Sequence, residues 1–323
     1  MAYGESIRSA VPVGGSDRRG PDGSGPRRTY RARRRLRPTM LGAVIVLVFL
    51  AAPLAIAGHL LTGGVQAPAG QGPALADGAS GQVPRTSVPR SEWPAQGQAA
   101  IVVAGGAAAA SPGQEPAPIA SLAKVMTAYL TLKRHPLGGS PGFTLTVSAE
   151  QAEAVAAEAD ENQSVVPVRA GERLTERQLL EALLIPSGNN IARMLAVGVG
   201  GDEGDFVAAM NAEARALGMA QTTYTDPSGF DPGTVSTATD QLRVFRAAMH
   251  YPVFRRIVSM ASATLPVAGT VTNFNPLVGQ GYAGKTGSDS AAGGCLAFFT
   301  RVTVGGERRT ASTELRQPAK EWR

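Results

Sequence analysis

Residues 118–130 read PIASLAKVMTAYL, which places a serine, a lysine three positions later and an apolar run typical of a buried helix in one stretch. The run predicts a helix over 121–133 that stops before Pro136. Ser121 then lies in the first turn, where backbone N–H groups lack helical partners and the helix dipole favours negative charge. Lys124 follows on the same face one turn later. A neutral lysine there can accept the serine proton, provided that burial and nearby cations lower its pKa.

Lysine is rare in this chain. Only four of the 31 basic residues are lysine, and the rest are arginine. A guanidinium stays charged in a protein, whereas a desolvated ammonium can lose its proton. Two of the four lysines lie in short motifs, S-L-A-K at 121–124 and K-T-G at 285–287. Lys285, expected on a distant strand, can supply a second cation and bind an anionic group of a substrate.

A third motif, Ser187-Gly188-Asn189, lies in the turn after Pro186. A serine there can relay a proton to a leaving amine, and an asparagine can exchange hydrogen bonds with a substrate amide. The same three residue types also build ordinary helix-to-helix turns. The order of the three motifs along the chain, and not this tripeptide alone, favours the catalytic interpretation.

The secondary-structure pattern predicts strands at both ends of a helical middle. Thr175 and Gln178 have the spacing of a capping box at the start of a helix that ends before Pro186, and Thr237 with Asp240 predicts the start of another helix. The other expected elements are strands at 99–103, 107–110, 144–147, 282–286 and 295–304, and helices at 191–197 and 204–217. This order predicts a mixed α/β domain whose sheet is closed by distant parts of the chain.

The first 95 residues differ in composition from the rest. Residues 1–39 form an Arg-rich tail, and 40–61 form an uncharged apolar run that predicts a transmembrane helix with the N-terminus in the cytoplasm. Residues 62–95, rich in Pro, Gly and Ala, predict a linker to a folded domain over 96–323. We therefore expect a single-pass protein of the cell membrane with an extracellular domain. A signal peptide cleaved near 55–57 is the alternative and predicts a secreted protein.

Charge and cysteine content exclude several functions. The net charge of +6 comes from the N-terminal tail, which has few aromatic residues, so we expect no nucleic-acid partner. Cys295 is the only cysteine and lies in an apolar run, which predicts a packed strand thiol and no intrachain disulfide. The three histidines, at 59, 135 and 250, do not have metal-ligand spacing, and we expect no metal site.

The order S-x-x-K, S-x-N, K-T-G is the signature of class A β-lactamases and penicillin-binding proteins. From about residue 98 to 304 the chain resembles the low-molecular-weight serine D-Ala-D-Ala carboxypeptidases of peptidase family S11, particularly actinobacterial ones. The stretches that carry the resemblance also include LLIPSGNNIA around 187, TDPSGFDPGTVSTATD at 225–240 and GKTGSDSAAGGCL at 284–296. It implies a β-lactamase/transpeptidase-like fold, in which an antiparallel sheet is flanked by a mostly helical region.

The resemblance also implies a reaction. Ser121 would attack the carbonyl between the two terminal D-alanines of a peptidoglycan stem peptide, with Lys124 as its base, and water would release the shortened peptide. The oxyanion would lie between the N–H groups of Ser121 and Ser288. Ser187, beside Asn189, would pass a proton to the departing D-alanine. β-Lactams would inhibit by acylating the same serine, and no cofactor is implied.

The K-T-G strand would bind the other end of the substrate. Lys285, Thr286 and Gly287 would hold the terminal carboxylate. Three other functions share the motifs and stay open, namely a class A-like β-lactamase, a non-catalytic penicillin-binding sensor, and a cell-envelope scaffold. The β-lactamase is disfavoured because 223–236, TYTDPSGFDPGTVS, lacks the glutamate of that family's loop. The preference among carboxypeptidase, endopeptidase and transpeptidase reactions also stays open.

The last 17 residues, ERRTASTELRQPAKEWR at 307–323, depart from the resembled pattern. They show neither the alternation of a strand nor the apolar face of a helix. The expectation is that the last strand and the closing helix are missing or altered. An unpaired sheet edge and an uncovered apolar face would then make the domain less stable than full-length relatives.

Overall fold

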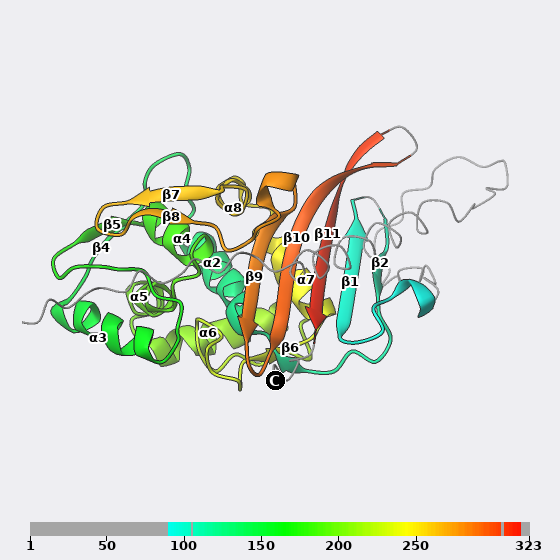
Figure 1. Ribbon diagram of the computed structural model, residues 1–323, viewed down its shortest axis with the longest axis horizontal. Helices are drawn as coiled ribbons and strands as arrows, with labels where there is room; N and C mark the ends of the chain where they lie inside the picture. Colours follow the sequence, from blue (N-terminus) through cyan, green and yellow to red (C-terminus); the bar gives the residue numbers. More distant parts are fainter. Residues whose placement is uncertain (1–89, 105, 305–306, 318–323) are drawn as a thin grey trace, which may run out of the picture. The chain divides into compact units, whose positions relative to one another are not determined.

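The structure is a computed structural model that describes residues 90–104, 106–304 and 307–317 (Figure 1). The chain divides into two units, Met1–Val44 and Ile45–Arg323, and every described residue belongs to the second. The predicted tail, the apolar run at 40–61 and the linker up to residue 89 lie outside the described residues. Within the described ranges, no helix combines the length and apolar character needed to cross a bilayer.

The main sheet has five antiparallel strands in the order β2-β1-β11-β10-β9 (Figure 1). Their bounds are β1 Gln98–Val103, β2 Ala108–Ala110, β9 Ala283–Asp289, β10 Gly293–Val304 and β11 Glu307–Gln317. The first two strands form the expected hairpin, and the last three come from the other end of the chain. The expected mixed α/β fold with a sheet closed by distant segments is therefore confirmed.

The expectation of a missing last strand is wrong. β11 pairs with β10 on one side and with β1 on the other, so the outer edge of β10 is not unpaired. Ala311, Ser312 and Thr313 are consecutive and all buried. A strand covered on both faces does not need to alternate apolar and polar residues, and small polar side chains fill this position. The predicted loss of stability therefore has no support from an unpaired edge of β10. The predicted change in the closing helix concerns residues after Gln317, which lie outside the described residues.

The described part of the chain contains seven α-helices, most of which lie to one side of this sheet (Figure 1). They are α2 Ala123–Arg134, α3 Ala149–Asp160, α4 Glu176–Leu184, α5 Asn189–Gly200, α6 Glu203–Ala216, α7 Ala238–Ala248 and α8 Pro252–Val258. The predicted caps form, because Thr175 and Gln178 make a capping box and Thr237 accepts from the backbone of Asp240. α3 was not predicted from the sequence, because its apolar positions are mostly alanine and none of its residues is fully buried, so its apolar face is weak.

Short elements complete the chain between these helices. The 3₁₀ turns are η1 Arg90–Glu92, η2 Ala120–Leu122 and η3 Val278–Gln280. The three small strand pairs are β3 Ala117–Pro118 with β6 Val235–Ser236, β4 Thr144–Thr146 with β5 Arg173–Thr175, and β7 Ser262–Leu265 with β8 Gly269–Thr272. The predicted strand at 144–147 is thus present as β4.

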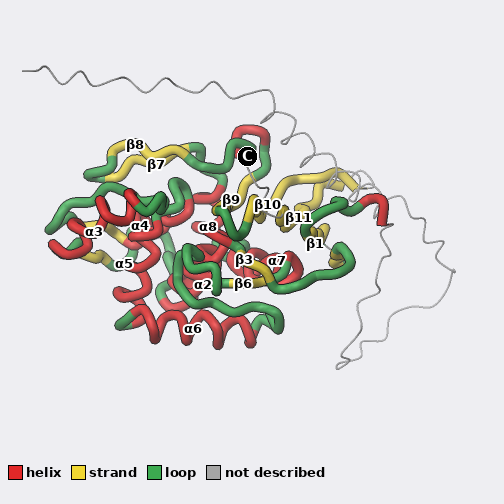
Figure 2. The backbone as a smooth tube through the Cα atoms, turned by 60° about the horizontal axis from the view of Figure 1, so that its bottom comes forward, coloured by secondary structure: helices red, strands yellow, loops and turns green. Residues whose placement is uncertain are grey.

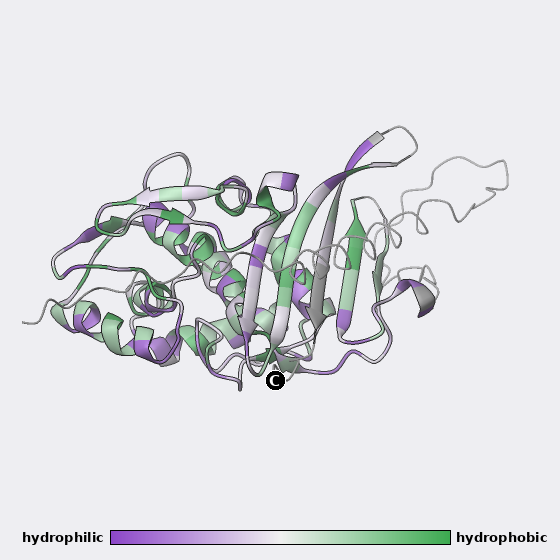
Figure 3. Ribbon diagram, in the orientation of Figure 1, coloured by the Kyte–Doolittle hydropathy of each residue, from purple (hydrophilic) through white to green (hydrophobic). Residues whose placement is uncertain are grey.

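The main hydrophobic cluster lies among the helices and reaches β9 and β10, and a small one lies between β1 and α7. α7 packs against β1 and β11, and α8 packs against β9 (Figure 2). Apolar residues concentrate on β1, β10 and the inner helices, whereas the exposed α3 carries many polar ones (Figure 3). α2 is buried over ten consecutive residues. Two lysines are nevertheless placed in this interior, Lys124 of α2 and Lys285 of β9, which are 0% and 1% exposed.

Candidate active site

Ser121 lies in the 3₁₀ turn η2, directly before α2 and not within the α-helix that the sequence predicted. Ala120 has a positive φ of 46°, which is unusual for a residue with a Cβ. The loop 225–234 holds this turn in place, because a Cβ added to Gly229, itself at φ 78°, would stand 1.8 Å from the carbonyl oxygen of Ala120. Only a glycine allows the loop to approach the nucleophile turn so closely.

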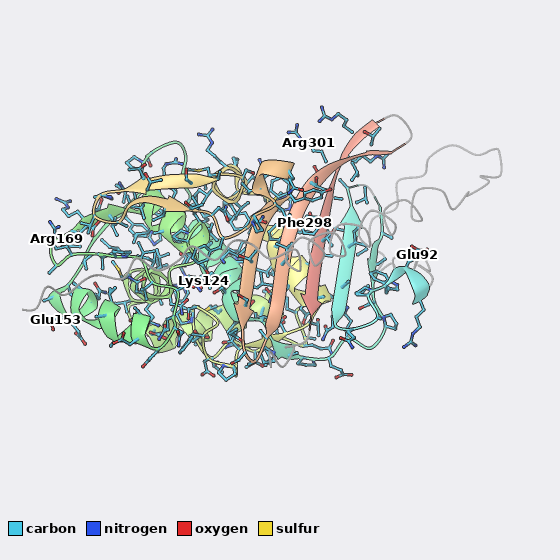
Figure 4. The ribbon with its side chains drawn as sticks, viewed as in Figure 1. Glu92, Lys124, Glu153, Arg169, Phe298 and Arg301 are labelled. Atoms are coloured by element: carbon cyan, nitrogen blue, oxygen red, sulfur yellow. The ribbon has the colours of Figure 1, made fainter. Side chains whose placement is uncertain are left out.

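Lys124 lies one turn after Ser121 and is surrounded by three oxygen atoms. Its Nζ is 2.7 Å from Ser121 Oγ, 2.7 Å from Asn189 Oδ1 and 2.9 Å from the carbonyl oxygen of Ser228. Figure 4 shows Lys124 between the helical region and β9, far from surface residues such as Glu153. The contact with Ser121 confirms the predicted side-by-side placement of the serine and the lysine.

The surroundings of Lys124 favour its neutral form. Burial has the largest effect and lowers the pKa of Lys124 well below its usual value. The positive charge of Lys285 lowers this pKa further, Asp226 raises it, and Arg193 lowers it again. A neutral amine has two N–H donors and one lone pair. The carbonyl oxygens of Asn189 and Ser228 can accept both donors, so the lone pair is directed at the hydroxyl of Ser121.

Asp226 shapes the loop that presents the Ser228 carbonyl. Its Oδ2 accepts hydrogen bonds from the backbone N–H and the hydroxyl of Ser228 and from the backbone of Phe230. Its Oδ1 accepts from the hydroxyl of Thr234. The Thr127 hydroxyl of α2 also donates to the carbonyl of Pro227 at 2.6 Å. These bonds tie the loop to the helix that carries the lysine.

Ser187 and Lys285 form the second pair of the site. Nζ of Lys285 donates to Ser187 Oγ at 2.9 Å and to the carbonyl of Thr286. Burial lowers the pKa of Lys285 to about 7. Ser187 has a φ of 64°, a strained value that the fold maintains before α5. Because Lys285 uses an acceptor position of the hydroxyl, the Ser187 proton remains available to a ligand in the cavity.

One cavity joins the two pairs. It has a volume of about 420 Å³, and its lining residues include Ser121, Ser187, Thr286, Gly287 and Ser288. A Cβ added to Gly287 would stand 2.9 to 3.1 Å from backbone atoms of 119–122, including the N of Ser121. A side chain at 287 would therefore crowd the amide of the nucleophile. The structure thus brings every residue that the sequence singled out to one place.

The comparisons with known proteins agree with this geometry. The model of the family Peptidase_S11, D-alanyl-D-alanine carboxypeptidase, matches residues 96–313. The chain belongs to peptidase family S11. It is 37% identical over 236 residues to the D-alanyl-D-alanine carboxypeptidase DacB2 of Mycobacterium tuberculosis, and the match covers 70% of this chain and 76% of the relative. A D-alanyl-D-alanine endopeptidase of Pseudomonas aeruginosa is 31% identical, over 57% of this chain and 60% of the relative.

Solved structures also match the fold of this S11 member. The Streptomyces K15 DD-transpeptidase has a TM-score of 0.61 and 26% identity, and the match covers 70% of this chain and 91% of that one. An evolved putative penicillin-binding protein homologue from Mycobacterium tuberculosis has a TM-score of 0.61 and 28% identity, over 74% and 88% of the two chains. The predicted β-lactamase/transpeptidase-like fold is thereby confirmed.

The sequence analysis missed three parts of the S11 site. Lys124 donates to the backbone carbonyl of Ser228, and a backbone contact of this kind cannot be read from a side-chain motif. The turn residues around Ser228 predict only that a loop is present. Ser164 lines the cavity from a segment without a recognised pattern, and Phe274 to Leu277 add an apolar wall. Cys295 is buried on β10 as predicted, and it also lines the cavity.

Proposed function

We propose that this S11 member is a serine D-Ala-D-Ala carboxypeptidase that trims the terminal D-alanine from peptidoglycan stem peptides. Ser121 Oγ attacks the carbonyl carbon between the two D-alanines, and its proton passes to Nζ of Lys124. The backbone N–H groups of Ser121 and Ser288 stabilise the oxyanion that forms. Collapse of this intermediate leaves an ester on Ser121, which water hydrolyses to regenerate the serine.

The leaving D-alanine is handled by the other pair. Ser187 relays to the departing nitrogen the proton that Lys124 took from Ser121, and Lys285, which donates to the same hydroxyl, keeps it oriented. Lys285, Thr286 and Gly287 hold the substrate carboxylate along β9. Binding this anion repays part of the cost of burying the ammonium, so the substrate raises the pKa of Lys285 and keeps it charged.

The main support for this proposal is the set of oxygen atoms around Lys124 Nζ. Two of its three oxygen neighbours, those of Asn189 and Ser228, can only accept hydrogen bonds, and the third belongs to Ser121. When both N–H donors of a neutral amine bind these two oxygens, its lone pair faces Ser121 and can take the serine proton. A scaffold that forms no covalent adduct would not need a buried amine with a lowered pKa at this position, whereas a penicillin-binding sensor would.

The family resemblance leaves the acyl acceptor open, since the names of similar proteins include a carboxypeptidase, an endopeptidase and a transpeptidase. All three reactions begin with the same acylation. A β-lactamase reaction is less well supported, because the loop over 223–236 has no glutamate and instead offers Lys124 the Ser228 carbonyl. Hydrolysis of a D-Ala-D-Ala peptide is therefore our first choice.

The test combines two measurements on the full chain. Intact mass after incubation with benzylpenicillin should show one stable adduct, and free D-alanine should appear from a pentapeptide ending in D-Ala-D-Ala. The Ser121→Ala variant should show neither. Adduct without D-alanine release would favour a penicillin-binding sensor, and rapid hydrolysis of benzylpenicillin would favour a β-lactamase. A folded chain that forms no adduct and releases no D-alanine would favour a scaffold.

We further propose that the catalytic domain acts outside the cytoplasm, anchored by the apolar run at 40–61. The support is the uncharged sequence of that run and the arginines that precede it. A protease added to intact cells or protoplasts should digest the domain while leaving residues 1–39 attached to the membrane. Recovery of the mature domain in the medium would instead support cleavage of a signal peptide.

A further inference from the structure

The segment 161–166, between α3 and β5, lines one wall of the cavity with Ser164 and is bonded to the first turn of α5. The backbone N–H of Asn189 donates to the carbonyl of Ser164 at 2.7 Å. The Asn190 side chain accepts from the N–H of Val166 at 3.0 Å and donates to its carbonyl at 2.8 Å. The wall and the helix that carries the S-x-N motif are therefore held together as one unit.

One further bond of this segment reaches the Asn189 side chain. Its Nδ2 donates to Gln163 Oε1 at 3.0 Å, which leaves Oδ1 directed at Lys124 Nζ, 2.7 Å away. An Asn189 amide turned by 180° would present N–H donors to Lys124. A neutral Lys124 would then lose an acceptor, and its lone pair would be drawn to Nδ2 and away from Ser121.

Charged neighbours fix the orientation of Gln163 in turn. Its Nε2 donates to Glu161 Oε2 at 2.9 Å, while Arg193 Nη1 donates to its Oε1 at 3.4 Å. Arg193 is also ion-paired with Glu158 of α3. A carboxylate beside the nitrogen and a guanidinium beside the oxygen both favour one orientation of the Gln163 amide. The charges of Glu161 and Arg193 therefore set the orientation of the Gln163 amide, and the Gln163 oxygen in turn sets the orientation of the Asn189 amide.

We propose that Gln163 is a positioning residue, which holds the Asn189 amide so that Lys124 directs its lone pair at Ser121. The inference rests on the proposed function, since it requires Lys124 to act as the base. Gln163 does not touch the reacting atoms. Its loss should therefore reduce the rate of acylation more than the binding of the ligand, which lowers kcat more than it raises KM.

The test compares two substitutions of Gln163 in the full chain, with acylation by benzylpenicillin followed by intact mass. Gln163→Met keeps the length of the side chain but removes the amide, and we expect acylation to slow by about 10- to 100-fold. Gln163→Glu restores an acceptor for Asn189 and should keep most of the rate. Its added negative charge should raise the pKa of Lys124 and move the acid side of the pH–rate profile to higher pH.

A double-mutant cycle separates positioning from a general structural effect. If Gln163 acts through Asn189, Gln163→Met should cause little further loss in an Asn189→Ala background. An equal loss in both backgrounds would overturn the proposal, as would an unchanged rate and pH profile in Gln163→Met alone. Gln221→Met, at an exposed position after α6, is the control for loss of a glutamine.

A control for folding separates the loss of acylation from the loss of structure in each variant. Thermal melting shows whether each variant folds, and Gln163→Ala, which leaves room for a water, replaces Gln163→Met if the latter does not fold. No acylation of the unaltered chain would overturn both the proposed function and the role of Gln163. Normal acylation by a folded Gln163→Met or Gln163→Ala variant would overturn the role of Gln163 alone.

Discussion

The helical side and the sheet side of the cavity each bury a lysine, but they surround it differently. Lys124 of α2 faces two carbonyl oxygens and Ser121, and burial with the charge of Lys285 lowers its pKa well below the usual value. Lys285 of β9 contacts Ser187 and the next backbone carbonyl, and its pKa is lowered to about 7 by burial alone. The same residue type is thus suited to accept a proton on one side and to bind an anion on the other.

The largest effect on acylation is expected from a substitution that keeps a permanent positive charge at position 124, on the helical side. Lys124→Arg places a group that cannot lose its proton beside Ser121, so acylation by benzylpenicillin should fall by about 10²- to 10⁴-fold, the usual contribution of a general base. Lys133→Arg on the same helix is the matched control, because its side chain is exposed and contacts Glu213 and the ring of Tyr129, away from the cavity. Near-normal acylation by Lys124→Arg would remove Lys124 from the role of base.

Removing the charge on the sheet side should have a smaller and more selective effect. Lys285→Met should lower kcat/KM by about 100-fold for a peptide with a free terminal carboxylate, because a charge-assisted hydrogen bond is worth about 1.5 to 3 kcal/mol. A peptide with a terminal carboxamide should lose less, because for it the substitution removes the orientation of Ser187 and the charge beside Lys124 but no carboxylate contact. An equal loss for both peptides would show that Lys285 does not act as the carboxylate anchor.

The pH dependence of kcat/KM should report the titration of both lysines, Lys124 and Lys285. The rate should rise with pH as Lys124 loses its proton and fall above about pH 7 as Lys285 becomes neutral in the free enzyme. Each limb should approach a tenfold change per pH unit. In Lys285→Met the alkaline limb should disappear. The acid limb should move to higher pH, because the charge that helps to lower the pKa of Lys124 is gone.

The sequence predicted the two lysines and their serines well, because each lies in a short motif on a regular element. The capping box at Thr175 and the cap at Thr237 predicted the starts of α4 and α7, and Pro186 predicted the end of α4 to within about two residues. What the motifs could not predict were backbone contributions, such as the Ser228 carbonyl and the positive φ of Ala120. These depend on how a loop a hundred residues away packs on the nucleophile turn.

Local patterns also failed where burial was unusual. α3 has no fully buried residue and its apolar positions are mostly alanine, whereas Ala311, Ser312 and Thr313 of β11 are all buried, so this part of the strand does not alternate. Both failures have one cause, since periodicity reports only elements that are buried on a single face. Gln163 was missed for a different reason, because its importance comes from two hydrogen bonds to residues more than twenty positions away.

The smallest expected effect concerns Phe274, which joins the two sides of the cavity. Its backbone donates to Ile185, just before Ser187, while its side chain is 55% exposed and lines the cavity. A ligand with an apolar side chain should cover part of this ring, a contact worth about 1 kcal/mol. Phe274→Ala should therefore slow acylation by benzylpenicillin roughly three- to tenfold, and leave 6-aminopenicillanic acid, which lacks the aromatic side chain, almost unaffected.

Phe230 provides the matched control for this prediction. It is 44% exposed and lies in the loop that holds the nucleophile turn, but it is not among the described residues that line the cavity. Phe230→Ala should therefore leave the ratio of the two acylation rates unchanged. If Phe274→Ala slowed both penicillins equally, the ring would act by supporting the turn at Ile185, on the helical side, and not by contacting the ligand. The ratio of the two rates thus decides to which side of the cavity Phe274 belongs.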